Sequence, residues 1–335
     1  MFFGRKKNAA GLLAEGHALL QTGRTDKAAT KFRAVTETEP NHAEAWFCLG
    51  TIHSGAGQWE QAVDCYRRSA RHAPPDRQFL PLFNMGNALQ SLRRAEEALE
   101  TFTQVTMVSP GFADAWINRG RLLDDAGHHT EAIASYDTAL ALTPRDVTAL
   151  ANRGNSLRAL NRVEEAVNSY EAALLLDPGD LASLSGLGSC LGSLGRPEEG
   201  LRLIDRALEA GRFPPALGER AILLSLLKRY DEALVSIDEA IRLGLRSAEI
   251  YNNRGEILAK LDKVDEAIGN FDDALNMNPR CVPALFGKAR VLCNAKRFAP
   301  AKAAIDLYFQ HSDGADGLAE SAQAVVSLCR EAGVK

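Results

Sequence analysis

Apolar residues recur along the chain with the spacing of an α-helix, in pairs of helix-length segments joined by short turns. Each pair contains a small residue followed twelve positions later by another, as in Gly50 and Ala62 or Gly120 and Ala132. This pattern occurs nine times, and successive units start 33 to 36 residues apart. The units span about residues 9–313, so the pattern predicts an all-α chain of nine helix pairs.

Two further positions predict how the helices of one unit meet. The small residues allow a close approach, and a large apolar residue four positions after the second one fills the gap between the helices: Phe32, Tyr66, Phe102, Tyr136, Tyr170, Ile204, Ile237, Phe271 and Ile305. A proline ends the second helix in six units, because proline cannot donate to the preceding turn: Pro40, Pro74, Pro110, Pro144, Pro178 and Pro279. One hairpin cannot bury its apolar face alone, so we expect the hairpins to stack into one elongated solenoid.

These residues resemble the tetratricopeptide repeat family, whose pattern is W-x2-L-G-x2-Y followed by Ala, an aromatic residue, Ala and Pro. Residues 43–74 show the match best, with Trp46, Leu49, Gly50, Ala62, Tyr66 and Pro74. Nine units in phase make the resemblance specific, and they cover nearly the whole chain. The repeats are similar to those of bacterial proteins and of the protein O-GlcNAc transferase. The resemblance implies a right-handed superhelical solenoid.

The segments outside the repeats divide the chain into three parts. We expect residues 1–8 to be a flexible basic tail, residues 9–313 the nine-repeat solenoid, and residues 314–335 a capping helix and tail. Residues 315–333 have the apolar spacing of one amphipathic helix. A solenoid needs such a polar-faced cap on its last repeat.

Charged residues recur at the seventh position of the unit, and a residue of opposite sign follows eighteen positions later. The pairs are Glu15–Arg33, Arg119–Asp137, Arg153–Glu171, Arg220–Asp238, Arg254–Asp272 and Lys288–Asp306. A half-buried arginine needs a partner, so we expect ion pairs within each hairpin. The alternative is that duplication copied both residues together and that they never touch.

The resemblance implies that the first helices line a concave groove in which an extended peptide lies. The polar residues expected to face it are Asn84, Asn87, Asn118, Arg121, Asn152, Asn155, Arg158 and Asn253. A carboxamide can bond both the N–H and the C=O groups of a peptide backbone, and the row resembles the asparagine ladder of the O-GlcNAc transferase repeats. Phe47 and Phe83 would add apolar contact. The alternatives are that these asparagines are only family consensus and that the phenylalanines pack against a neighbouring repeat.

The sixth repeat has only small residues at its groove positions: Ala182, Ser185, Gly186, Ser189, Gly192 and Ser193. Side chains of this size predict a shallow, open stretch, which is either a place where a ligand comes close or a soft joint. The joint is favoured because this repeat lacks its terminal proline and because several glycines weaken a helix.

The net charge, the length of the apolar runs and the cysteines limit the kinds of ligand and the location that we expect. The net charge of −4 opposes a role that depends on phosphate contacts, so we expect no nucleic-acid ligand. No apolar run is long enough to span a membrane, and no signal peptide is recognisable. The six scattered cysteines favour a reducing, cytoplasmic location over disulfides or a zinc site.

No catalytic motif occurs in the chain, and we expect neither an enzyme activity nor a cofactor or metal. The sequence therefore predicts a non-catalytic scaffold that binds an extended peptide segment of a partner protein. The alternative is a self-assembling structural protein, active as a homo-oligomer without a peptide ligand.

Overall fold

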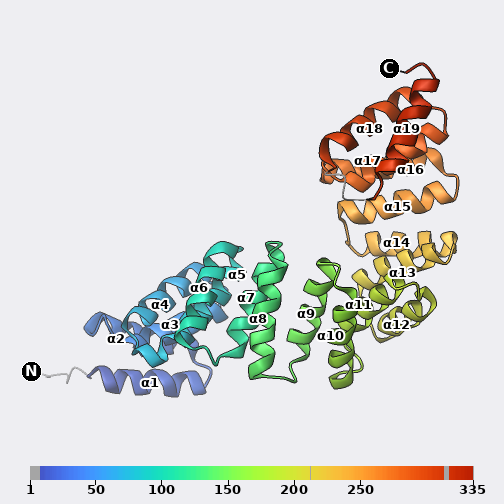
Figure 1. Cartoon of the computed structure of the whole chain (residues 1–335). Helices are drawn as coiled ribbons and strands as arrows, with labels where there is room; N and C mark the ends of the chain where they lie inside the picture. Colours follow the sequence, from blue (N-terminus) through green and yellow to red (C-terminus); the bar gives the residue numbers. More distant parts are fainter. Residues whose placement is uncertain (1–7, 212, 313–316, 335) are drawn as a thin grey trace, which may run out of the picture. The chain divides into compact units, whose positions relative to one another are not determined.

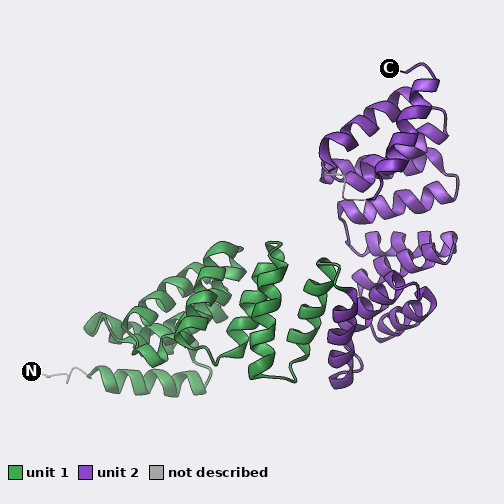
Figure 2. Cartoon of the chain, viewed as in Figure 1, with its two compact units in different colours: residues 1–162 green, residues 163–335 purple. Residues whose placement is uncertain are grey.

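The computed structural model describes residues 8–211, 213–312 and 317–334, and in these residues it contains helices and no strand (Figure 1). The prediction of an all-α chain is confirmed. The chain forms two compact units, residues 1–162 and 163–335, which are described separately below (Figure 2). The boundary falls between the two helices of the fifth predicted repeat. Most of the expected tail at residues 1–8 lies outside the described residues.

Unit 1 contains four helix hairpins followed by a single helix. Its α-helices are α1 (Ala9–Gln21), α2 (Thr25–Thr38), α3 (Ala43–Gly55), α4 (Trp59–His72), α5 (Phe79–Ser91), α6 (Ala95–Val108), α7 (Ala113–Asp125), α8 (His129–Leu142) and α9 (Val147–Ala159). A short 3-10 helix, Pro75–Arg77, precedes α5. From α1 to α9 each helix packs against the next one along the chain, so α3, α5 and α7 each contact their own second helix and the preceding one.

Unit 2 begins with a single helix, continues with four hairpins and ends with one more helix. Its helices are α10 (Val163–Leu176), α11 (Leu181–Ser193), α12 (Pro197–Ala210), α13 (Pro214–Leu226), α14 (Tyr230–Arg242), α15 (Ala248–Lys260), α16 (Val264–Met277), α17 (Val282–Asn294), α18 (Phe298–His311) and α19 (Ala319–Glu331). The consecutive packing is the same as in unit 1.

Contacts between a glycine and an aromatic ring hold the helices of each hairpin close together. A Cβ atom at Gly50 would lie 2.7 Å from the Tyr66 ring, and one at Gly120 would lie 2.6 Å from the Tyr136 ring. Both rings are almost completely buried. The predicted role of the small residues is therefore confirmed: any side chain at these glycines would displace a core ring.

The stretch of small residues on α11 is closed, so the expectation of an open surface is wrong there. A Cβ atom at Gly186 would lie 2.4 Å from Tyr170, and one at Gly192 would lie 2.3 Å from Leu223. At the contact between α11 and α12, a Cβ atom at Gly200 would lie 2.3 Å from the carbonyl oxygen of Gly188. Neighbouring helices approach closely wherever side chains are small, because the freed space is filled by packing.

The ion pairs join consecutive repeats, and the prediction that they lie within one hairpin is wrong for Arg220, Arg254 and Lys288. Arg254 Nε is 2.6 Å from Asp238 of the preceding second helix, and Asp272, its predicted partner, pairs with Lys288. Arg220 in the same way pairs with Asp205, at 2.7 Å.

The reason for this pairing is the position of each first helix between two second helices. Arg220 donates through Nε to Asp205 behind it and through Nη1 to Ser236 Oγ, 2.7 Å away on its own second helix. Arg119 makes the corresponding contacts with Thr103 and Ser135. The guanidinium thus bridges three helices, which sequence spacing alone did not reveal.

The helix α19 covers the last hairpin by packing on α17 and α18. It buries Ala322, Val325, Val326 and Cys329, and its outer face is mostly polar, with Ala319, Ala324 and the 47% exposed Leu328 as its apolar members. Among the residues that the structure describes, no helix is both long and apolar enough to cross a bilayer.

Candidate functional site

The predicted asparagines of unit 1 lie on the exposed side of its first helices, and we call Asn84, Asn87, Asn118, Asn152 and Asn155 the amide row. Asn84 and Asn87 are one turn apart on α5, as are Asn152 and Asn155 on α9. The structure brings α5 and α7 together within the row, because Asn118 Nδ2 donates to Asn87 Oδ1 at 3.4 Å. The row therefore crosses from one repeat to the next.

Other members of the row have different surroundings. The side-chain amides of Asn84 and Asn152 are half-buried and make no hydrogen bond with any residue in the described ranges. Arg121 is exposed beside the row and donates from Nη2 to Gln90 Oε1 at 2.9 Å. Arg158 is exposed on α9, one turn beyond Asn155. Two amides of the row thus keep their hydrogen-bonding capacity for a ligand.

A cluster of hydrogen bonds around the Asp124 carboxylate lies next to the row and was not predicted from the sequence. Asp124 accepts hydrogen bonds from Tyr136 Oη at 3.0 Å and from Ser156 Oγ at 2.7 Å, and His129 Nδ1 lies 3.0 Å from it. Burial, and secondly the Asp124 charge, raise the pKa of Tyr136. With Asn152 and its neighbours, the cluster lines a cavity of about 260 Å³. Its only signal in the sequence is an aspartate twelve residues before a core tyrosine.

The hydrogen bonds of this cluster join three helices. Ser156 is 1% exposed, and its hydroxyl is within hydrogen-bond distance of the Asp124 carboxylate at 2.7 Å and of the carbonyl oxygen of Asn152 at 3.1 Å. No group of three or more His, Cys, Asp or Glu side chains is placed to hold a metal in residues 8–211, 213–312 and 317–334. The cluster instead fixes α9 against α7 and α8 and so supports the amide row.

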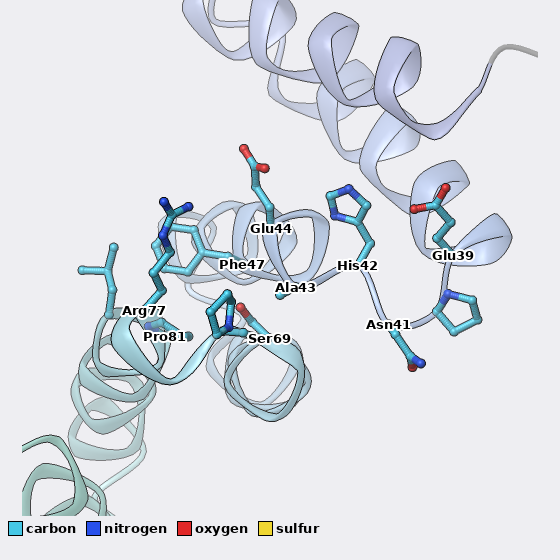
Figure 3. Close-up of a pocket in the computed structure, with 13 residues that line it drawn as sticks. Glu39, Asn41, His42, Ala43, Glu44, Phe47, Ser69, Arg77 and Pro81 are labelled. Carbon is cyan, nitrogen blue, oxygen red and sulfur yellow. The ribbon is translucent and has the colours of Figure 1, made fainter. Parts of the chain in front are cut away.

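A larger pocket lies at the N-terminal ends of α3 and α5, and we call it the α3–α5 pocket (Figure 3). Its volume is about 760 Å³. The lining residues are Glu39, Pro40, Asn41, His42, Ala43, Glu44, Phe47, Ser69, Ala73, Pro74, Arg77, Leu80 and Pro81. Leu80 lies one turn before Asn84 on α5, so the pocket is next to one end of the amide row.

The two predicted phenylalanines have different environments. Phe47 lines the α3–α5 pocket, with its ring centroid 5.8 Å from that of Tyr66. Phe83 lies with its ring centroid 4.9 Å from Phe112 and 5.6 Å from Phe102, in edge-to-face contact with both. Phe83 is therefore engaged in packing between repeats, while Phe47 also faces the pocket.

The first helices of unit 2 provide a smaller opening. Asn253 lines a cavity of about 200 Å³ together with Ser225 and Leu226, and its Oδ1 accepts from Asn252 Nδ2 at 3.4 Å. Further along this face, an ion pair connects α15 to α17, because Arg290 Nη2 lies 2.6 Å from Glu256 Oε2. In unit 2 the ninth positions of α15 and α17 are thus joined by an ion pair.

Comparison with known proteins agrees with this architecture. A profile of the tetratricopeptide repeat family matches residues 13–77, 83–147, 152–216 and 219–275. Anaphase-promoting complex subunit 3 of Schizosaccharomyces pombe (strain 972 / ATCC 24843) is 26% identical over 107 residues. That match covers 32% of this chain and only 16% of the length of the relative.

Two solved structures have a similar fold. A tetratricopeptide repeat protein from Parabacteroides merdae ATCC 43184 has a TM-score of 0.58 and 18% identity, over 75% of this chain and 98% of that one. A chain of the APC/C hetero-tetramer Cut9-Hcn1 has a TM-score of 0.62 and 17% identity, over 87% of this chain and 57% of that one. Since the family profile matches well over half of the residues, this chain belongs to the tetratricopeptide repeat family.

Proposed function

We propose that the chain is a non-catalytic scaffold that binds an extended segment of a partner protein along the first helices of unit 1. The repeats and the similar folds support a role in protein–protein interaction. The observation that carries the finer proposal is the amide row, in which the side chains of Asn84 and Asn152 bond none of the residues that the structure describes and Asn118 holds Asn87 in place. Fixed amides at the surface can bond a peptide backbone whatever its side chains are.

The remaining parts of the proposal follow from composition and from the cysteines. The ligand is a protein and not a nucleic acid, because a net charge of −4 leaves little attraction for phosphates. Five of the six cysteines are buried free thiols, which favours a reducing cytoplasmic location. The curated relative is by its name a subunit of a complex, in agreement with partner binding.

The experiment begins with display of a random peptide library against the full chain. The affinity of the selected peptides is then measured by fluorescence anisotropy. The triple variant Asn84→Ala/Asn118→Ala/Asn152→Ala is expected to bind at least about tenfold more weakly, since hydrogen bonds to three backbone groups are lost. The matched control replaces exposed amides on second helices, in Gln104→Ala/Asn168→Ala/Asn276→Ala, and should bind like the wild type. Equal affinities of the two triple variants would refute the proposed role of the row.

Self-assembly is the competing function, and the mostly polar outer face of α19 opposes end-to-end stacking at that end. Sedimentation equilibrium separates the two functions. A mass of 36.3 kDa at all concentrations supports the scaffold, while a mass that rises with concentration supports assembly.

A further inference from the structure

The α3–α5 pocket has a polar floor that the protein leaves unsatisfied. Ser69 of α4 is 2% exposed, yet its hydroxyl makes no hydrogen bond with any residue that the structure describes. In the described part of the chain, the fully enclosed side-chain atoms without a partner are Ser183 Oγ, Ser225 Oγ and Asn252 Oδ1, so the Ser69 hydroxyl keeps some accessible surface, and in the pocket that it lines a ligand atom can reach it. A serine hydroxyl can donate to the carbonyl oxygen of a bound peptide.

The walls of the pocket are apolar. Phe47 lies on the α3 side and Pro81 on the α5 side (Figure 3), and Leu80 of α5, which is 43% exposed, also lines the pocket. A cavity of about 760 Å³ falls in the range of pockets that hold several connected groups and not one methyl. The walls therefore suit one aliphatic side chain together with its neighbouring backbone.

The rim carries opposite charges on its two sides. Glu39 and Glu44 lie on the side formed by the end of α2 and the start of α3, and Arg77 lies on the α5 side. The Arg77 side chain is 80% exposed, and its neighbour Asp76 is 4.0 Å away, at the limit of an ion pair. The Glu44 side chain is 57% exposed and contacts His17 at 3.0 Å. Both signs of charge thus remain accessible to a ligand.

We propose that this pocket binds the anchor of the partner segment, namely one aliphatic residue with an acidic residue on its Arg77 side and a basic residue on its glutamate side. This inference rests on the proposed function, because it assumes that an extended peptide continues along the amide row. A uniformly acidic segment would meet Glu39 and Glu44, and a uniformly basic one would meet Arg77. Complementary charges at an interface fix the register and direction of a bound chain.

The test uses short fluorescent peptides with a central leucine and four charge arrangements: acidic then basic, basic then acidic, acidic on both sides, and basic on both sides. Binding to the full chain is measured by anisotropy at low and high salt. One of the two mixed arrangements should bind at least about fivefold more tightly than both uniform ones. The ratio between its affinity and that of the uniform peptides should decrease as the salt concentration increases, because exposed charges are screened.

The variant Arg77→Glu makes both sides of the rim acidic. It should change the order of affinities of the four peptides, so that the peptide with basic residues on both sides binds best. Arg71→Glu is the matched control, because Arg71 is an exposed arginine on α4 that does not line the pocket, and it should leave the order unchanged. Leu80→Ala should weaken the best peptide about tenfold, as expected for a central apolar anchor.

The results separate failure of this inference from failure of the proposed function. If all four peptides bind equally and Arg77→Glu changes nothing, the inference is overturned, even where peptides from the library still depend on the amide row. If no library peptide depends on the amide row, the proposed function fails with it. A reversed order in Arg77→Glu supports both, because a merely structural role of Arg77 would not exchange one preferred peptide for another.

Discussion

The first helices of the two units use equivalent repeat positions in opposite ways. In unit 1 the ninth position holds Asn87 and Asn155, beside the amides of Asn84 and Asn152. In unit 2 the ninth position holds Glu256 and Arg290, which pair with each other at 2.6 Å. The same repeat position thus carries an amide in unit 1 and an ion pair between repeats in unit 2, so repeat position alone does not fix the role of a side chain.

The largest expected effect tests the dense packing of unit 2. Gly200→Ala would place a methyl group 2.3 Å from the carbonyl oxygen of Gly188, and a backbone atom cannot move aside cheaply. We expect a loss of about 3 kcal/mol in the free energy of unfolding, measured by urea denaturation. The control Gly269→Ala has open space around the new methyl and should gain up to about 1 kcal/mol through helix propensity. Equal stability of the two variants would contradict the packing described for α11 and α12.

The next effect tests the support of the amide row in unit 1. Asp124→Ala leaves the buried Tyr136 hydroxyl without its acceptor and removes the bond from Ser156 Oγ that ties α9 to α7, and we expect a loss of about 2 kcal/mol in the free energy of unfolding. Asp125→Ala, the exposed neighbour, should change stability by less than about 0.5 kcal/mol. Thermal unfolding of both variants measures the difference. A similar small change in both would mean that the carboxylate cluster does not hold α9 in place.

A smaller effect concerns the ion pairs between repeats. A double-mutant cycle on Arg254 and Asp238 should give a coupling of about 0.5 kcal/mol, because solvent screens the half-exposed Asp238. The same cycle on Arg254 and Asp272, the pair predicted from spacing, should give a coupling near zero. A coupling between Arg254 and Asp272, with none between Arg254 and Asp238, would show that the ion pair lies within one hairpin.

These ion pairs show what sequence could and could not predict. The hairpins were predictable because the requirement for a small residue opposite Tyr66 or Tyr136 is local and repeats in phase. The partner of Arg254 was not, because repetition places an aspartate both before and after it, and only packing decides between them. The unpaired Ser69 and the Asp124 cluster were invisible for the same reason, since each depends on contacts between different helices.

The smallest effect is a pH dependence of stability. Burial raises the pKa of Cys48 and Cys65 from 9.0 to about 11. The folded state keeps these protons after the unfolded chain has lost them, so the stability is unaffected below about pH 9 and falls as the pH rises towards 11. Urea denaturation at pH 7.5 and pH 10 should show a smaller loss in Cys48→Ala/Cys65→Ala than in the wild type. An unchanged loss would mean that other groups dominate the alkaline range.

The central claim is that a partner segment lies along the first helices of unit 1. The most direct measurement is photo-crosslinking of the full chain with a library-selected peptide that carries a diazirine at its centre, followed by mass spectrometry of the linked residues. The account predicts crosslinks to α3, α5, α7 and α9 on the side of Asn87 and Phe47. Crosslinks confined to the second helices, or to the face of α15 and α17, would contradict it.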